Sequence, residues 1–256
     1  MPTARMCLLY WLTRRPILLQ WVQWSRGRLT AELSVMLEQV SPGYVVFDVG
    51  ANQGYFTRLY SLLVGRHGRV YAFEPVPTTF RVLQERMAEQ QVIPNIDLIN
   101  VALADTSGTA VMYLPGQNDV EASLLPHRGV GSWRTADPPA TFQCRQIRLD
   151  DFVRDRGLTR LDFLKCDVEG AELLVLRGAT DTLKQFQPVL YLEVSPDWTV
   201  DFGYHPTAII EFLRPLGYNR FLLVTAERSH PQPTGAAQLK SLTGSANLLC
   251  LPIQGR

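Results

Sequence analysis

The chain has 256 residues, of which 46% are hydrophobic, and its formal net charge at pH 7 is +1. This length is enough for one sizeable domain, and the near-zero charge without an aromatic-and-basic RNA-binding motif argues against a nucleic-acid partner. The four cysteines are scattered without a C-x-x-C pair, so we expect neither a disulfide framework nor a zinc site, and a reducing cytosol fits best.

Residues 1–40 differ in composition from the rest of the chain. Five arginines occur there with no acid before Glu32, interleaved with Trp11, Trp21 and Trp24. The apolar runs are too short to span a membrane, and no signal-peptide cleavage site follows. We expect a helical arm, with residues 41–256 forming one domain. Two interpretations of the arm stay open: it packs over the active site or a partner subunit of a homodimer, or residues 1–30 lie peripherally on a membrane surface. Packing is favoured, because tryptophans in soluble enzymes are more often buried anchors.

A short β-branched run, Val45–Val49, breaks into a glycine turn before a helix at residues 55–64. This pattern predicts a central strand of a parallel sheet. Gly50 and Gly54 permit positive φ and a close backbone approach, so we expect them, with Asn52 between them, to shape the turn around a ligand. Asp48, at the tip of the strand, suits a ligand that presents donors or positive charge.

The sequence of the turn distinguishes between two possible cofactors, NAD and S-adenosylmethionine. A dinucleotide fingerprint, G-x-G-x-x-G, needs glycine where Asn52 stands, so an NAD-dependent oxidoreductase is the less favoured alternative. S-adenosylmethionine (SAM) carries no phosphate, and it needs a glycine turn for its methionine portion and an acid for its ribose. The next strand, residues 69–73, ends in Glu74, about 20 residues beyond the last glycine, where a ribose-binding acid belongs. A plain turn with a solvated Glu74 is the weaker interpretation.

A helix at residues 77–90 and a strand at 96–104 follow, and the strand ends before Asp105. The carboxylate of Asp105 could accept a hydrogen bond from an adenine amino group. The sequence Asp-Thr-Ser-Gly is equally an ordinary turn, so both interpretations stay open.

Helical periodicity lapses at residues 109–148, where short strands at 110–114 and 142–148 flank a Gly- and Pro-rich segment. We interpret this as an insertion, and the sequence does not decide between a lid and a surface loop. Its polar and aromatic groups suited to substrate recognition are Asn118, Glu121, Ser123, His127, Arg128 and Trp133. For His127, a solvated loop histidine is favoured over a catalytic one.

The segment 161–172 is the second informative stretch. Lys165, Asp167 and Glu169 alternate with apolar residues near the end of a predicted core strand, so they project from one face. Charges in a central parallel strand imply ion pairing, a ligand, or both. The alternative is that Lys165, Asp167 and Glu169 form an ion cluster whose charges pair only with one another and bind no ligand. Gly170 then turns the chain into a helix.

A further buried strand at residues 188–194 carries Glu193 near its carboxyl end. Ligands of open α/β sheets bind outside the carboxyl ends of the strands, so Asp48, Glu74, Asp167, Glu169 and Glu193 are expected to face one crevice. His205, on the adjoining loop, is the histidine best placed to reach a substrate, and helix capping beside Pro206 explains it equally well. A helix at 207–213 and strands at 218–224 and 247–253 complete the prediction.

These motifs together resemble the FkbM-type methyltransferase family, a branch of the class I SAM-dependent methyltransferases. The matching segments are F-D-V-G-A-N-Q-G at 47–54, A-F-E-P at 72–75, N-V-A-L-A-D at 100–105, L-D-D-F at 149–152, K-C-D-V-E-G-A-E at 165–172 and L-G-Y at 216–218. The resemblance implies a Rossmann-like α/β fold, with a seven-stranded, mostly parallel sheet, helices on both faces and an antiparallel last strand. It also implies O-methylation of a hydroxyl on a small molecule, sugar, glycan or polyketide-type product.

The resemblance and the residues agree on the cofactor site. Asp48 is expected to orient the methionine end of SAM, Glu74 to hold the ribose and Asp105 to meet the adenine. The alternative function, which involves no catalysis, is that of a SAM-binding adaptor that acts through its N-terminal arm.

For catalysis we place Asp167 beside the transferring methyl, with Glu193 opposite it and Lys165 behind it. Two mechanisms use this arrangement. Either Asp167 or a neighbouring histidine such as His205 takes the acceptor's proton, or Asp167 and Glu193 hold a divalent cation. The metal-free mechanism is favoured, because only two or three candidate oxygens converge.

Overall fold

The structure is a computed structural model, and it describes residues 30–89, 94–115, 121–127, 133, 139–225 and 230–253. The expected arm is therefore described only from Thr30 onward, and Asn118 and Arg128 lie outside the described residues. Among the described residues, no helix combines the length and apolar character needed to cross a membrane.

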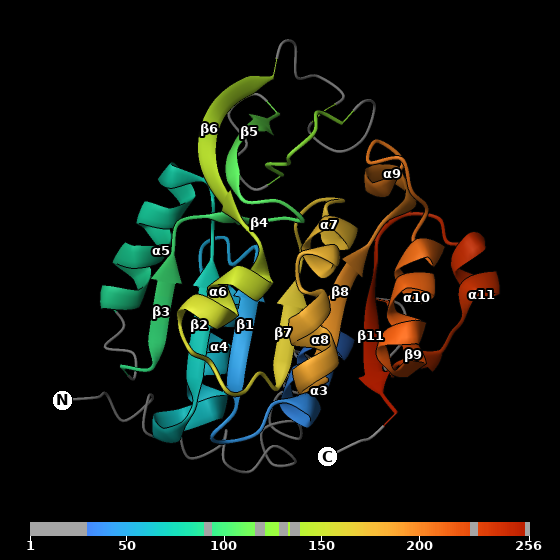
Figure 1. Ribbon diagram of the computed structural model, residues 1–256, viewed down its shortest axis with the longest axis horizontal. Coiled ribbons are helices and arrows are strands. Elements are labelled where there is room, and N and C mark those ends of the chain that lie inside the picture. Colours follow the sequence, from blue (N-terminus) through green and yellow to red (C-terminus); the bar gives the residue numbers. More distant parts are fainter. Residues whose placement is uncertain are drawn as a thin grey trace.

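A central sheet organises the fold (Figure 1). Its spatial order is β10-β9-β11-β8-β7-β1-β2-β3, and all neighbouring pairs from β8 to β3 are parallel. The last strand, β11, lies between β8 and β9 and is antiparallel to both, which confirms the expected seven-stranded arrangement. A two-residue strand, β10, is added at the edge. The bounds are β1 Val45–Val49, β2 Arg69–Phe73, β3 Ile96–Ile99, β7 Phe163–Cys166, β8 Val189–Val194, β9 Tyr218–Val224, β10 Gln232–Pro233 and β11 Ala246–Pro252.

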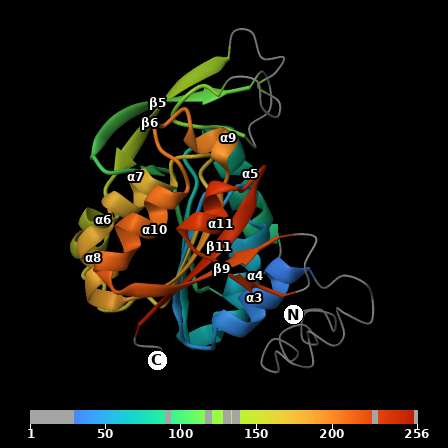
Figure 2. The ribbon, with the colours of Figure 1, turned by 90° about the vertical axis from the view of Figure 1, so that its right-hand side faces the viewer.

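Helices cover both faces of this sheet, as expected. Figure 2 shows one layer with α3, α4 and α5 and, across the sheet, a second layer with α6, α7, α8 and α10. The bounds are α3 Ala31–Gln39, α4 Tyr55–Val64, α5 Pro77–Glu89, α6 Leu149–Asp155, α7 Glu172–Arg177, α8 Thr180–Phe186, α9 Pro196–Thr199, α10 Thr207–Leu213 and α11 Ala236–Lys240, with 3₁₀ turns at Gly65–His67 and Arg214–Leu216.

The helix α3 packs into the core. Thr30 caps it by accepting a hydrogen bond from the backbone N–H of Leu33 at 3.1 Å. Val35, Met36 and Leu37 are at most 2% exposed and belong to the same apolar cluster as Tyr60 of α4. The C-terminal part of the expected arm is thus a packed helix on one face of the sheet.

The strand expected at residues 96–104 is interrupted, which corrects the prediction. β3 ends at Ile99, and residues 102–103 form a separate strand, β4, in another sheet. The side-chain amide of Asn100 explains the break, because it donates hydrogen bonds to the backbone oxygens of Glu74 and Pro75 at 2.8 and 3.1 Å. The chain is thereby turned away from β2.

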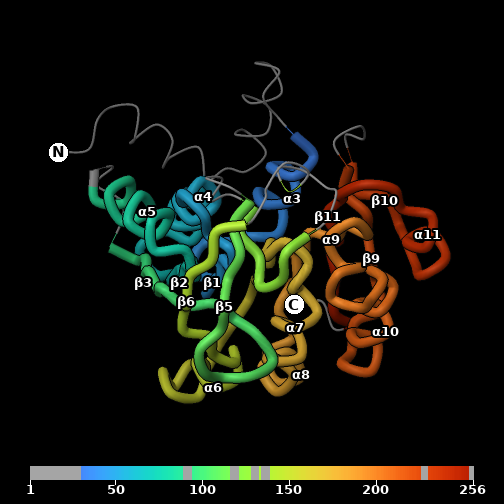
Figure 3. The backbone as a smooth tube through the Cα atoms, turned by 90° about the horizontal axis from the view of Figure 1, so that it is seen from above, coloured from blue at the N-terminus to red at the C-terminus, as the bar shows by residue number. Residues whose placement is uncertain are grey.

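A second sheet lies over the carboxyl edge of the first. Its order is β4-β6-β5, formed by Ala102–Leu103, Ala140–Ile147 and Gly108–Leu114. Seen from above, β5 and β6 cross over the β1–β2 region (Figure 3). The two strands expected in the insertion are present and slightly longer than predicted, and the insertion sits where a ligand of the main sheet would bind.

Candidate active site

A cavity of about 420 Å³ opens at the carboxyl ends of β1, β2 and β7. Its lining includes the glycine turn after β1, the segment after β2 and the turn after β7. The insertion contributes Met112, Ala122 and Leu124. This volume falls in the range of small-molecule and cofactor sites, and the cavity lies at the sheet edge to which the sequence assigns the ligand.

The glycine turn adopts the expected left-handed conformations. Gly50 and Gly54 have φ of 75° and 85°, and Asn52 between them has φ of 49°. A Cβ on Gly50 would lie 1.8 Å from the carbonyl oxygen of Asp167, and one on Gly54 would lie 2.5 Å from Leu83. Packing against backbone therefore also requires glycine at position 50, whereas at Gly54 the neighbouring atoms are ends of side chains and the positive φ is the stronger requirement.

The backbone N–H groups of this turn bond to protein acceptors. Those of Gly50 and Ala51 both donate to the carbonyl oxygen of Phe73, at 3.0 and 2.9 Å. That of Asn52 donates to the carboxylate of Glu74 at 2.8 Å. A pyrophosphate is normally cradled by such N–H groups, so the turn is poorly suited to a dinucleotide.

Glu74 is buried, not solvated. Its side chain lines the cavity, and the residue is only 5% exposed. Its two oxygens accept hydrogen bonds from the N–H groups of Asn52 and Val76, at 2.8 and 2.9 Å. Burial raises the pKa of Glu74 to about 7 in spite of these bonds. The carboxyl thus stands at the strand tip expected for a ribose-binding acid.

Asp48 lies beneath the cavity and is not part of its lining. It is fully buried, and Thr57 donates a hydrogen bond to its Oδ2 at 2.6 Å. Its Oδ1 has no hydrogen-bond partner among the described residues. Burial raises the pKa of Asp48, an effect that the charge of Lys165 opposes. Any influence of Asp48 on a ligand therefore passes through its charge or through the turn above it.

Lys165 and Asp167 form a buried ion pair at the edge of the cavity. The ammonium of Lys165 lies 3.0 Å from Oδ2 of Asp167 and 5.2 Å from the ring centre of Phe56. Burial lowers the pKa of Lys165, but the charges of Asp167 and Asp48 outweigh it and the net pKa is raised. Burial likewise acts to raise the pKa of Asp167, but Lys165 holds it below its ordinary value. Asp167 is therefore ionised at neutral pH.

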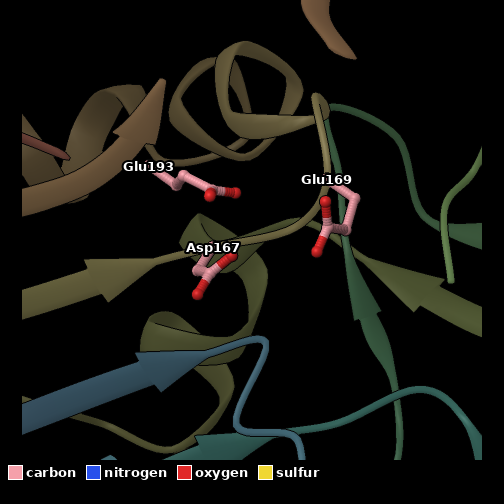
Figure 4. A group of neighbouring side chains, drawn as sticks. All are labelled: Asp167, Glu169 and Glu193. Carbon is pink, nitrogen blue, oxygen red and sulfur yellow. The ribbon is translucent and has the colours of Figure 1, made fainter. Parts of the chain in front are cut away.

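Asp167 is also one of three carboxyl groups that converge here (Figure 4). Oxygens of Asp167, Glu169 and Glu193 all lie within 4.8 Å of one another. Burial, and then the charge of Asp167, raise the pKa of Glu193 to about 10, so Glu193 is protonated and donates a hydrogen bond to Asp167. The same two causes raise the pKa of Glu169 to about 8. Of the three, Asp167 and Glu169 line the cavity.

The turn after β7 is held by a residue whose role the sequence did not reveal. Glu172 is 1% exposed, and its carboxylate accepts hydrogen bonds from the N–H groups of Val168 and Gly170, at 3.0 and 3.3 Å. The hydroxyl of Tyr204 donates to the carbonyl oxygen of Gly170 at 2.7 Å. The spacing of Glu172, two residues after the glycine, is the signal that could have indicated this cap.

Asp105 and His205 stand away from the cavity lining. Asp105 lies in the bend between β4 and β5, the location of an ordinary turn. Nδ1 of His205 lies 3.3 Å from the backbone N–H of Thr207, at the start of α10. This is the helix-capping role that the sequence left open, and the structure does not bring His205 to the carboxyl cluster.

His127 is not a solvated loop histidine, which corrects the prediction. It is 3% exposed, and its ring lies edge-on against Trp133 and Trp198, with centres 5.5 and 4.5 Å apart. Its Nδ1 lies 2.9 Å from the carboxylate of Asp201. Its Nε2 lies 3.0 Å from the carbonyl oxygen of Glu169. Trp198 and Asp201 come from a distant part of the chain, so local composition did not indicate this burial.

The Methyltransferase FkbM domain matches residues 48–220, more than half of the chain. The chain belongs to the FkbM methyltransferase family. This confirms the family recognised from the sequence motifs, and SAM is the cofactor of the methyltransferase class to which that family belongs.

Three FkbM relatives illustrate the similarity. The chain is 32% identical over 164 residues to the 31-O-demethyl-FK506 methyltransferase FkbM of Streptomyces tacrolimicus, covering 56% of this chain and 62% of that protein. It is 28% identical over 199 residues to the 2-O-methyltransferase NoeI of Sinorhizobium fredii, covering 74% and 78%. It is 28% identical over 160 residues to the hexuronic acid methyltransferase AglP of Haloferax volcanii, covering 62% and 59%. The chain thus spans about three fifths of the length of the first and third of these relatives.

Proposed function

We propose that this protein is a SAM-dependent O-methyltransferase that acts on a hydroxyl of a small molecule, sugar, glycan or polyketide-type product. The observation that carries the proposal is the composition of the cavity. It combines a glycine turn whose first N–H groups are bonded within the protein with three lining carboxyls, Glu74, Asp167 and Glu169. Such a site suits a cationic ligand without phosphate and disfavours NAD.

The residues fit SAM at several points. Gly50, Asn52 and Gly54 shape the turn for its methionine portion, and Glu74 accepts hydrogen bonds from its ribose. Asp48 supports the methionine end from below through its negative charge. Contact of Asp105 with the adenine remains a proposal, because Asp105 is not part of the described lining.

Methyl transfer needs alignment and removal of a proton. SAM supplies a methyl group already activated on a sulfonium, so the carbon–sulfur bond breaks as the bond from the acceptor oxygen to carbon forms. The hydroxyl proton of the acceptor then passes to a carboxylate of the protein. Asp167, kept ionised by Lys165, is the base expected from the sequence. We propose Glu169 as a second candidate base, because it lines the cavity and its pKa of about 8 suits proton transfer.

The metal-free mechanism is the one we propose. Lys165 already neutralises Asp167, and Glu193 carries a proton that it donates to Asp167. A divalent cation bound by Asp167 and Glu193 would have to displace that proton and lie close to the ammonium group of Lys165, which Coulomb repulsion disfavours. Activity lost to EDTA and restored by magnesium would reverse this preference.

An aromatic side chain at the cavity suits an acceptor with a ring or an apolar body. Tyr55 lines the cavity, is 70% exposed, and rests edge-on against Phe56 with ring centres 5.0 Å apart. The 31-O-demethyl-FK506 methyltransferase and the 2-O-methyltransferase among the relatives are both named for methylation at oxygen, which supports a hydroxyl acceptor. Peripheral membrane contact through residues 1–30, a homodimer and a cytoplasmic location remain proposals.

The test is incubation of the protein with methyl-labelled SAM and a crude small-molecule extract, followed by mass identification of the labelled product. We expect a labelled methyl ether and stoichiometric S-adenosylhomocysteine. SAM binding without any S-adenosylhomocysteine would instead support the adaptor alternative, in which the protein acts through its arm.

A further inference from the structure

Two side chains of the insertion, Ser123 and His127, meet at the backbone carbonyl oxygen of Glu169 in the turn after β7. This oxygen accepts a hydrogen bond from Oγ of Ser123 at 2.9 Å and another from Nε2 of His127 at 3.0 Å. Glu169 itself has φ of 52°, a left-handed conformation that is strained for a residue with a side chain. Such a conformation persists only where the surroundings hold it in place.

Both donors are rigidly held. Ser123 is fully buried, and its backbone N–H and carbonyl pair with Tyr113 of β5 at 3.0 and 2.9 Å. The ring of His127 packs edge-on against the rings of Trp133 and Trp198, and its Nδ1 lies 2.9 Å from the carboxylate of Asp201. Asp201 follows α9, so His127 joins three segments that are far apart in sequence. The two donors therefore have little freedom to move away from the carbonyl.

Other parts of the turn are held from elsewhere. The N–H groups of Val168 and Gly170 bond to Glu172, and the carbonyl of Gly170 bonds to Tyr204. None of these three bonds involves the insertion. Removing Ser123 or His127 would leave the Glu169 carbonyl with one donor instead of two, while the bonds to Glu172 and Tyr204 stay in place. Because backbone dihedrals set the direction of the Cα–Cβ bond, the Glu169 carboxyl would then be held less firmly beside Asp167.

We propose that Ser123 and His127 are positioning residues for methyl transfer: they hold the carbonyl of Glu169 and thereby keep its carboxyl at the acceptor side of the cavity. The insertion is then part of the catalytic machinery and more than a cover. The effect on methyl transfer rests on the proposed function. The structural part of the proposal, that Ser123 and His127 hold the Glu169 carbonyl, rests on the hydrogen-bond geometry alone.

The test uses the full-length protein and four variants. Ser123→Ala removes one donor, and His127→Phe removes the other while keeping an aromatic ring against the tryptophans. Ser123→Thr keeps the hydroxyl, and His67→Phe changes an exposed histidine in the 3₁₀ turn after α4. The measurements are SAM affinity by calorimetry and the rate of labelled methyl transfer to the small-molecule extract as a function of SAM concentration.

We expect the maximal rate to fall roughly tenfold in Ser123→Ala and in His127→Phe, the effect of about one hydrogen bond. The KM and Kd for SAM should stay unchanged, because β1 and β2 supply the cofactor side. Ser123→Thr, which keeps the hydroxyl but adds a methyl group at a buried site, should retain more activity than Ser123→Ala, and His67→Phe should behave like the wild type. Wild-type rates in both donor variants, or a loss of SAM affinity and thermal stability equal to the loss of rate, would overturn the proposal.

If the wild type binds SAM but transfers no label to any acceptor, the proposed function fails. Amide hydrogen exchange then still tests whether Ser123 and His127 hold the turn after β7. We expect faster exchange across residues 167–172 in Ser123→Ala and in His127→Phe than in His67→Phe. Exchange equal in all of these variants would overturn the positioning role.

Discussion

Asp167 owes its charge to its two neighbours. Lys165 lies 3.0 Å away, and protonated Glu193 donates a hydrogen bond to it. Asp167→Asn keeps the shape and removes the charge, so we expect methyl transfer to fall roughly 10²–10⁴-fold, the usual contribution of a general base. SAM affinity should be nearly unchanged. Labelled-SAM turnover and calorimetry measure both quantities, with Asp181→Asn on the exposed side of α8 as the matched control. Wild-type turnover in Asp167→Asn would end its assignment as the base.

Glu169 gives the reaction a pH dependence of known sign. Burial and the neighbouring charge of Asp167 raise its pKa to about 8, so its basic form is scarce below that pH and abundant above it. If Glu169 takes the acceptor's proton, the rate should rise as the pH passes through about 8. Glu169→Gln should remove this rise and lower the rate at high pH. A pH–rate profile of the two proteins decides the matter, and an identical rise in both would exclude Glu169 as the base.

Glu74 accepts a hydrogen bond from the glycine turn and is also the residue proposed to bind the ribose of SAM. Alanine in its place would leave the N–H groups of Asn52 and Val76 without their acceptors, whereas Glu74→Gln keeps one of the two acceptor oxygens and is therefore the milder variant. A hydrogen bond to a charged group contributes about 1.5–3 kcal/mol, and we expect Glu74→Gln to weaken SAM binding by that amount. Calorimetry against Glu85→Gln, an exposed glutamate on α5, measures the difference. Unchanged affinity would remove Glu74 from the ribose site.

At the scale of the element, α3 anchors the N-terminal segment to the core. Met36 is fully buried, and the hydroxyl of Tyr60 lies 2.9 Å from its sulfur. We expect Met36→Ala to lower the free energy of unfolding by about 2–5 kcal/mol. Thr30→Ala, which removes the N-cap of the same helix, should cost about 1 kcal/mol. Urea unfolding of both variants provides the measurement, and a smaller loss for Met36→Ala than for Thr30→Ala would contradict the packing of α3.

A chain that begins at Ser41 loses this helix, so a chain that begins at Thr30 is the better test of SAM binding without the arm.

The elements that depend on local pattern were predictable. The β-branched run of β1, the two glycines after it and the alternation around Lys165 identify two of the strands whose carboxyl ends line the cavity. The break after β3 was not predictable, because it depends on an amide of Asn100 that reaches back to the backbone after β2.

The hydrogen bonds from Ser123 and His127 to the carbonyl oxygen of Glu169 were equally unpredictable from the sequence. Ser123 and His127 are separated from Glu169 by 46 and 42 residues along the chain. Only the folding of the insertion over the main sheet brings these groups together. Sequence patterns report neighbours on one strand or helix, and they carry little information about a contact between two loops.

At the scale of the whole molecule, buried carboxyls make stability depend on pH. Mainly through burial, the pKa values of Glu74 and Glu172 are raised to about 7, that of Glu169 to about 8 and that of Glu193 to about 10. The unfolded chain releases these protons near its ordinary glutamate pKa of about 4.3. Above that pH the folded state therefore binds more protons than the unfolded state, and the free energy of unfolding falls as the pH rises through the folded-state values.

We thus expect the thermal unfolding midpoint of the SAM-free protein to decrease as the pH is raised from about 5 to about 9. Glu193→Gln keeps a hydrogen-bond donor toward Asp167 and cannot ionise, so its midpoint should decrease less steeply at the alkaline end. Cationic SAM should raise the midpoint more at high pH than at low pH, because the carboxyls around it are then charged. Circular dichroism at a series of pH values, with and without SAM, measures all three effects. A midpoint that rises over this range, or a Glu193→Gln slope equal to that of the wild type, would show that the carboxyl cluster does not bind the extra protons on which this expectation depends.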